Sequence, residues 1–128
     1  MKILIAEDDA MMMASIKYQL KKEGYSVTSA VNGREGLLAY NKEVPDLVIT
    51  DIIMPLTSGL EFIGFVRSVN QEIPILVLSG IDEEDTVLEA FNLGADDFLL
   101  KPVKPGELSV RLQRLLKKAG KQAPAKIK

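Results

Sequence analysis

The sequence contains no histidine and no cysteine among its 128 residues. Without histidine the chain lacks the commonest general base and the commonest transition-metal ligand, and without thiolates as well a zinc or copper site is disfavoured. A cation bound by oxygen atoms, such as Mg²⁺ or Ca²⁺, is compatible with this composition. The chain also cannot carry a phosphohistidine, so a phosphoryl group carried on histidine must be donated by another molecule.

Long apolar runs are missing too. No stretch approaches the roughly 18–20 apolar residues that span a bilayer, and Met1-Lys2 leads directly into a strand-like run without the features of a signal peptide. Together with the lack of cysteine, this predicts a cytoplasmic protein without membrane contact. A hydrophobic content of 47% in 128 residues predicts one globular domain with an ordinary core.

Basic residues are scarce outside the C-terminus. The net charge is −2, but residues 117–128 hold five lysines and no acid, so the first 116 residues carry 11 basic and 18 acidic side chains. Such an acidic body disfavours direct binding of nucleic acid. We expect a domain over residues 1–118 and a flexible basic tail, or a linker cut short, over 119–128. Contact of this tail with an anionic partner stays open.

Strand-like and helix-like segments alternate five times along the chain. The predicted strands span residues 3–6, 25–30, 46–51, 75–78 and 97–101. The predicted helices span residues 10–23, 33–42 and 105–118, with two more that follow Gly59 and the acidic loop 81–84. This alternation predicts an α/β fold of the (βα)5 type, a doubly wound parallel five-stranded sheet with helices on both faces.

Four of the predicted strands end in polar residues of different chemistry. These residues are Glu7, Asp8 and Asp9 after the first strand, Asp51 after the third, Ser79 after the fourth and Lys101 after the fifth. Because ligands of open α/β sheets bind outside the carboxyl ends of the strands, we expect these side chains to meet. Acids with one hydroxyl and one ammonium suit a divalent cation together with a phosphoryl group.

In this order the motifs resemble the receiver (CheY-like) domain of response regulators from two-component signal transduction systems. The resemblance covers residues 2 to about 118 and rests on residues 7–9, the segment 45–55 around Asp51, Gly59, Ser79, residues 94–96 and Lys101-Pro102. It implies the flavodoxin-like strand order 2-1-3-4-5. It also implies a phosphorelay switch that receives a phosphoryl group from a histidine kinase or phosphotransfer protein and turns over no separate substrate.

The resemblance implies a role for each residue at the strand ends. Asp51 becomes the aspartyl phosphate, Ser79 bonds a phosphoryl oxygen, and Lys101 contacts both groups through its ammonium. The Lys101–Pro102 peptide bond is implied to be cis. Taken alone, Asp51 also fits a turn after a buried strand and Lys101 an exposed surface lysine.

A Mg²⁺ site is implied as well. Asp8, Asp51 and the backbone carbonyl of Ile53 are expected to bind the ion, and Glu7 to act through water. Asp9 falls just beyond the acidic pair Glu7 and Asp8. It is expected to cap the next helix, where the helix dipole also favours acids. Because Ile53 is apolar, it should hinder attack by water and slow self-dephosphorylation, although Gly80 after Ser79 removes shielding beside the site.

The resemblance extends to the output surface. Phe98 occupies the aromatic switch position, next to the space that Ser79 vacates when it moves. The alternative is that Phe98 is an ordinary core residue of an edge strand. The helix 105–118 and Asp96-Asp97 resemble receivers that dimerise, when phosphorylated, through their fourth helix, fifth strand and fifth helix. Acid–arginine pairs cross that interface, and the matching residues here are Asp96, Asp97, Glu107, Arg111 and Arg114.

Three other classes of protein share part of this pattern. A flavodoxin-type FMN binder has the same layout, but the acids at residues 7–9 would repel its phosphate. A haloacid-dehalogenase-type phosphatase needs an acid where Ile53 stands. A degenerate receiver that acts only as a protein-interaction module is the alternative that stays open.

Overall fold

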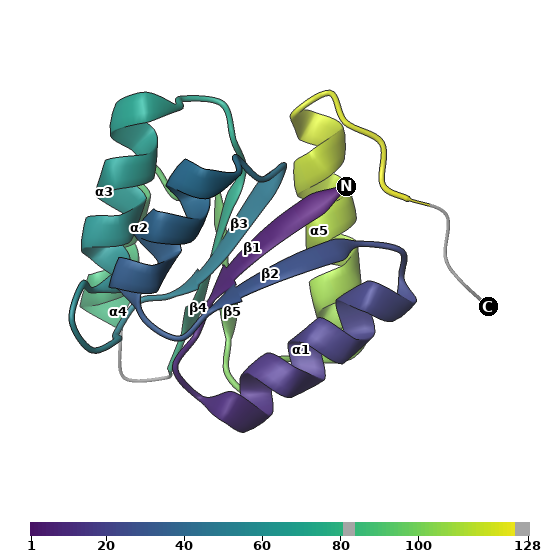
Figure 1. Ribbon diagram of the computed structural model, residues 1–128, viewed down its shortest axis with the longest axis horizontal. Coiled ribbons are helices and arrows are strands. Elements are labelled where there is room, and N and C mark those ends of the chain that lie inside the picture. The colour runs from purple at the N-terminus through teal and green to yellow at the C-terminus, as the bar shows by residue number, and fades with distance from the viewer. Residues whose placement is uncertain (81–83, 125–128) are drawn as a thin grey trace.

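A computed structural model describes residues 1–80 and 84–124 of the chain. Strands and helices alternate throughout, and their bounds are β1 Lys2–Ala6, α1 Ala10–Lys22, β2 Ser26–Ala30, α2 Gly33–Lys42, β3 Leu47–Asp51, α3 Gly59–Val69, β4 Ile75–Ser79, α4 Glu84–Leu93, β5 Asp97–Leu100 and α5 Pro105–Lys118 (Figure 1). All strand pairs are parallel, in the order β2-β1-β3-β4-β5. The predicted fold class and strand order are confirmed.

The predicted element bounds agree with the structure to within about one residue, with one exception. Three residues of the predicted acidic loop, 81–83, lie outside the described residues, and the fourth, Glu84, already belongs to α4. The predicted cap at Asp9 is confirmed, because its carboxylate accepts hydrogen bonds from the N–H groups of Met11 and Met12 at 2.9 and 3.0 Å.

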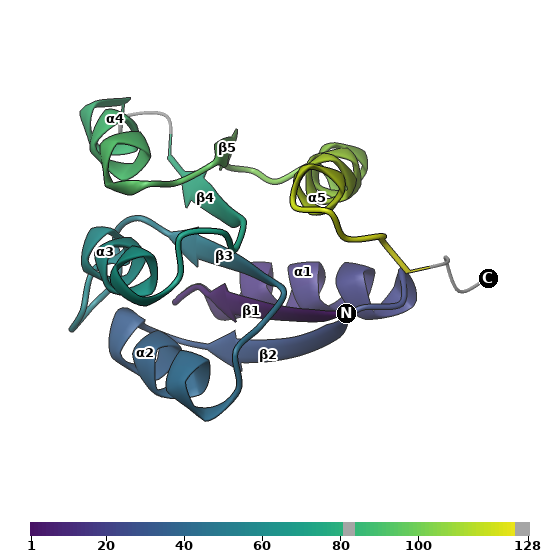
Figure 2. The same ribbon diagram turned by 90° about the horizontal axis from the view of Figure 1, so that it is seen from above.

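The core lies in two layers, one on each face of the sheet. Helices α2, α3 and α4 cover one face, and α1 and α5 cover the other (Figure 2). Because successive strand residues point to opposite faces, neighbours along a strand enter different layers. Leu4 packs with Phe62 of α3 in the first layer, whereas Ile5 packs with Leu112 of α5 in the second. Every residue of β3 and β4 is buried, as expected for central parallel strands.

The register of the sheet brings the ends of the strands together. Asp51 of β3 lies opposite Leu78 of β4, and Ser79 lies opposite Leu100 of β5. The side chains that follow β1, β3, β4 and β5 therefore gather at one end of the sheet, which we call the carboxyl end. The end where the strands begin is the amino end.

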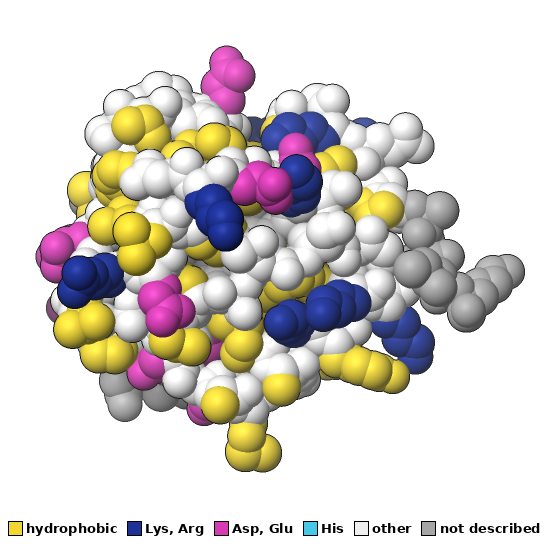
Figure 3. Space-filling model, in the orientation of Figure 1, with side chains coloured by type: hydrophobic (Ala, Val, Ile, Leu, Met, Phe, Trp, Pro, Cys, Tyr) yellow, Lys and Arg dark blue, Asp and Glu magenta, His cyan; other side chains and the backbone are white. Residues whose placement is uncertain are grey.

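The surface mixes charges of both signs. In the view of Figure 3, Lys and Arg side chains lie beside Asp and Glu, and hydrophobic side chains gather over α2 and α3. None of the described helices is long and apolar enough to cross a membrane. Beyond α5, residues 119–124 run back toward the start of β1 (Figure 1). The predicted domain boundary at residue 118 stays a prediction.

Candidate phosphoryl-acceptor site

Three carboxylates meet at the carboxyl end of the sheet. Glu7, Asp8 and Asp51 each offer an oxygen, and these atoms lie within 4.8 Å of one another. Glu7 is fully buried and Asp51 is only 2% exposed, whereas Asp8 is open to solvent. Like charges this close repel each other unless a cation or a proton lies among them.

Asp51 is held tightly in place. Its Oδ1 accepts the N–H of Ile52 at 2.8 Å, and its Oδ2 accepts the ammonium of Lys101 at 2.6 Å. The hydroxyl of Thr50 donates to the Asp51 carbonyl at 2.9 Å. A Cβ at Gly59 would collide with that same carbonyl oxygen, so α3 begins against the backbone of Asp51. The carboxylate therefore points from a fixed backbone into the acidic cluster.

Lys101 is the cation that the structure provides for this cluster. Its backbone N–H bonds the carbonyl of Ser79 at 2.8 Å, which sets its place after β5, and its peptide bond to Pro102 is cis. The ammonium also lies 3.4 Å from Glu7 Oε2. Partial burial alone would lower the pKa of Lys101, but the hydrogen bond and charge of Asp51, with the negative charge of Glu7, raise it. Lys101 is thus a permanent positive charge beside Asp51.

The surroundings of Glu7 disfavour its charged form, whereas those of Lys101 favour its charged form. Its Oε1 accepts the N–H of Asp9 at 3.1 Å, but Oε2 is buried without a hydrogen-bond partner among the described residues. Burial and the negative charge of Asp51 raise the pKa of Glu7 to about 7, although Asp9 and Lys101 work against the shift. One lysine therefore does not balance the acids of this cluster.

Ser79 is the second buried group at this end of the sheet that lacks a partner. It is fully buried, and its Oγ finds no hydrogen-bond acceptor or donor in the part of the chain that the structure describes. A buried hydroxyl without a partner costs free energy, and an ordered water, an ion or a ligand group can satisfy it. Its position at the end of β4, beside β3, suits a ligand bound to Asp51.

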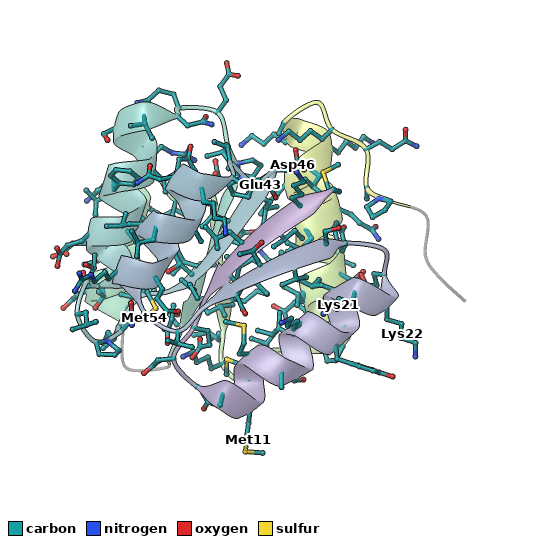
Figure 4. All side chains as sticks on the ribbon, viewed as in Figure 1. Met11, Lys21, Lys22, Glu43, Asp46 and Met54 are labelled. Atoms are coloured by element: carbon teal, nitrogen blue, oxygen red, sulfur yellow. The ribbon has the colours of Figure 1, made fainter. Side chains whose placement is uncertain are left out.

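The loop between β3 and α3 forms the rim of the site. Ile53 is 60% exposed, whereas Met54 is buried and turns inward (Figure 4). Leu56 has φ 65°, a left-handed conformation that costs a leucine about 1–2 kcal/mol. A Cβ at Gly33, the first residue of α2, would collide with the backbone of Thr57. Sequence reasoning missed Leu56 and this close approach, because no periodic pattern marks them.

Phe98 lies on β5, next to the site. It is partly buried and meets Phe91 of α4 edge to face, with ring centroids 5.9 Å apart. Phe98 and Val87 line a small pocket that also reaches Ser79. The ring thus has apolar contacts on α4 and open space on the side of the serine.

Two of the acids expected at a dimer interface, Asp96 and Asp97, have partners within this chain. Asp97 accepts Arg111 Nη1 through both carboxylate oxygens at 2.8 Å. Asp96 Oδ2 accepts Arg67 Nη2 of α3 at 2.8 Å. The described conformation therefore satisfies these acids without a second subunit.

Fold and site together define a class of protein. A doubly wound parallel domain carries a buried aspartate at the carboxyl end of its sheet, flanked by two acids, a lysine and a buried hydroxyl. The oxygen-only donor set fits a hard divalent cation, as does Glu7 Oε2, which lacks a hydrogen-bond partner among the described residues. Such a site can stabilise a negatively charged group attached to the aspartate, because a cation and nearby donors surround it.

Comparison with known proteins identifies the family. The response regulator receiver domain matches residues 3–113, and the chain belongs to this family. It is 34% identical over 124 residues to the alkaline phosphatase synthesis transcriptional regulatory protein PhoP of Bacillus subtilis, covering 97% of this chain and 52% of that protein. It is 38% identical over 117 residues to the response regulator MprA of Mycolicibacterium vanbaalenii, covering 91% and 51%. The chain thus spans about half the length of these relatives.

Solved structures support the same assignment. A response regulator receiver domain protein from Clostridium thermocellum superposes with a TM-score of 0.87 at 28% identity, covering 93% of this chain and 96% of that one. Chemotaxis protein CheY4 of Vibrio cholerae gives a TM-score of 0.84 at 34% identity, covering 90% and 98%. Membership of this family implies a phosphoryl-accepting switch of a two-component system.

Proposed function

We propose that Asp51 accepts a phosphoryl group from a histidine kinase or phosphotransfer protein, in a Mg²⁺-dependent reaction that needs no other substrate. The observation that carries this proposal is a buried aspartate bonded to Lys101 and flanked by two buried oxygens, Glu7 Oε2 and Ser79 Oγ, that lack hydrogen-bond partners among the described residues. A structural cluster of this kind would have its hydrogen bonds completed. Here they are left for a ligand.

The reaction is an in-line displacement at phosphorus. A carboxylate oxygen of Asp51 forms the new O–P bond while the P–N bond to the donor histidine breaks, and the electron pair leaves with the imidazole. Lys101 is already bonded to Asp51 and neutralises charge on the phosphoryl oxygens. Ser79 donates its hydroxyl to one of those oxygens, which gives its buried Oγ a partner.

The acids on the other side of Asp51 are the proposed metal ligands. Asp8 and Asp51 would bind Mg²⁺ directly with the backbone carbonyl of Ile53, and Glu7 would hold one of its waters. The bound ion supplies positive charge for the phosphoryl oxygens. Exposure of Asp8 beside two buried acids leaves the cluster open to solvent on one side, as a partly hydrated ion requires.

The phosphorylated state is reported on the surface of α4, β5 and α5. When Ser79 moves toward the phosphoryl group, the pocket beside it admits the ring of Phe98. Phenylalanine has no hydroxyl that could anchor an outward rotamer, so packing alone, including the edge-to-face contact with Phe91, sets the position of the ring. A homodimer through this surface would require Asp97 and Arg111 to exchange their present partners across the interface.

The lifetime of the aspartyl phosphate depends on Ile53. Its exposed side chain stands on the rim of the site, where an attacking water must approach. Replacement by a polar residue such as Asn should speed self-dephosphorylation, as measured by the loss of phosphoprotein after the donor is removed. An unchanged rate in Ile53→Asn would remove Ile53 from this role.

The proposal is tested by intact mass after incubation with acetyl phosphate, with and without Mg²⁺. We expect a gain of one phosphoryl group that requires Mg²⁺ and disappears in Asp51→Asn. Asp9→Asn is the matched control, because asparagine still caps α1 and Asp9 lies outside the proposed ligands. If no condition phosphorylates the chain, the degenerate receiver that acts only as a protein-interaction module replaces the proposal.

A further inference from the structure

The end of α5 turns the chain back onto the domain. Gly120 has φ 78°, a conformation that glycine adopts readily, and its N–H bonds the carbonyl of Lys117 at 3.0 Å. The N–H of Lys121 bonds the carbonyl of Leu116 at 2.8 Å. This pair of bonds is the Schellman motif, which ends the helix and fixes the direction of the residues that follow.

Lys121 then bonds a residue far away in the sequence. Its ammonium donates to the backbone carbonyl of Asp46 at 3.1 Å and lies 3.3 Å from Asp46 Oδ1. Asp46 immediately precedes β3 at the amino end of the sheet. Figure 4 labels it beside the C-terminal end of α5, with Met54 at the opposite end of β3.

Asp46 is itself tied to a second strand. Its Oδ2 accepts the N–H of Lys2 at 2.7 Å, and its own N–H donates to the carbonyl of Lys2 at 2.8 Å. Asp46, which directly precedes β3, therefore binds both β1 and the segment after α5 through its side chain. Burial alone would raise the pKa of Asp46, but the N–H of Lys2 and the ammonium of Lys121 lower it.

Apolar contact continues beyond the ion pair. Ala123 is partly buried and packs against the core layer under α1 and α5, whereas Gln122 before it is exposed. Only 34% of the Lys121 side chain is exposed. Two kinds of contact thus hold the same short segment.

We propose that residues 119–124 form a latch: the folded unit extends to residue 124, and the Lys121–Asp46 pair fixes the direction in which the chain leaves the domain. The latch lies at the amino end of the sheet, about 16 Å along β3 from Asp51 at roughly 3.3 Å per residue. The latch therefore holds residues 119–124 at the end of the domain opposite Asp51. The inference is independent of phosphorylation at Asp51.

The test is backbone ¹⁵N relaxation of the 128-residue chain. We expect order parameters near 0.8 for residues 119–123 in the unmodified protein, as for a rigid backbone. In Lys121→Ala the values for residues 122 and 123 should fall below about 0.6, whereas residues 119–121 keep the backbone hydrogen bonds of the Schellman motif. Lys118→Ala is the matched control, because this exposed lysine in the last turn of α5 makes none of the latch contacts, and it should leave the values unchanged. Lys121→Arg, which keeps the charge and donors, should retain most of the order.

Two results would overturn the proposal. Order parameters below about 0.6 in the unmodified chain would show that residues 119–123 are not docked. Retained order of residues 122 and 123 in Lys121→Ala would show that the ion pair does not hold them. The spectrum of residues 1–118 reports in the same experiment that each variant is folded, so loss of the latch is distinguishable from unfolding.

Discussion

The two ends of the sheet differ in how completely their polar groups are paired. At the carboxyl end, Glu7 Oε2 and Ser79 Oγ are buried without hydrogen-bond partners among the described residues. At the amino end, the carboxylates of Asp46 and Asp96 are each shared between a backbone N–H and a cation from a distant element. Because unpaired buried polar groups cost free energy, we infer that the amino end stabilises the domain while the carboxyl end is kept for a ligand.

Breaking the amino end should have the largest effect on stability. Arg67 is only 12% exposed and donates to the carbonyl of Gly94 and to Asp96, whose Oδ2 also accepts the N–H of Ile75. Asp96→Ala leaves a largely buried guanidinium without its carboxylate, so we expect the free energy of unfolding to fall by about 2–3 kcal/mol in urea titrations.

The matched control removes an acid from a more exposed pair, which lies in the first turns of α5. Glu107 lies 3.9 Å from Arg111 in α5, and both side chains are at least a third exposed. Glu107→Ala should cost less than about 0.5 kcal/mol. Equal losses in the two variants would contradict the view that the pairs at the amino end carry stability.

The contribution of the carboxyl end to the free energy of unfolding should fall as the pH rises. The pKa of Glu7 is raised to about 7 from its ordinary value of 4.5, so the folded chain holds a proton that the unfolded chain releases between these values. This contribution is fully present below about pH 4.5 and is lost as the pH rises through 7, by on the order of 2 kcal/mol without metal. Urea unfolding in EDTA at pH 5 and pH 8 measures it.

Glu7→Gln isolates the contribution of this carboxyl. The glutamine has nearly the same shape but does not titrate. The free energy of unfolding of the variant, relative to that of the unmodified chain, should therefore increase from pH 5 to pH 8. Mg²⁺ at pH 8 should restore the stability of the unmodified chain, because the folded state alone binds it. Parallel pH profiles of the two proteins would rule out Glu7 as the source.

The same contrast shows what the sequence can and cannot predict. Strand periodicity and the chemistry of the strand ends predicted that Asp51, Ser79 and Lys101 would meet, because parallel strands place their ends together. The structure brings all three together. Their roles, like those of Glu7, Asp8, Ile53 and Phe98, stay predictions.

The pairs at the amino end were not predicted. Lys121 and Asp46 are separated by 75 positions, and Arg67 and Asp96 by 29. Hydrophobic periodicity says which face of an element is buried, but it does not say which surface acid meets which base. The burial of Glu7 beside an exposed Asp8 is likewise a property of the folded loop, since the two acids look alike in the sequence.

Backbone strain at the carboxyl end gives a smaller and opposite effect. Leu56 holds φ 65° with 72% of its side chain exposed, so its removal loses little packing. Leu56→Gly should raise the free energy of unfolding by about 0.5–1 kcal/mol, the relief of left-handed strain less the extra entropy of an unfolded glycine. Leu56→Ala keeps the strain and should change stability little; a gain as large as that of glycine would point to the side chain instead.

The smallest effect should appear at the amino end in acid. The pKa of Asp46 is lowered below 3.8, so the stabilisation from its partners is fully present above that value and is lost as the pH falls through the folded-state pKa. Both Asp46 and Lys121 are about one-third exposed, so the pair is worth under about 1 kcal/mol. The stability gap between the unmodified chain and Lys121→Ala should therefore be widest near pH 6 and close toward pH 3. Acid thus weakens the latch at the amino end, whereas it stabilises the carboxyl end by protonating Glu7. A stability difference between the unmodified chain and Lys121→Ala that widens on acidification would contradict this contrast between the two ends of the sheet.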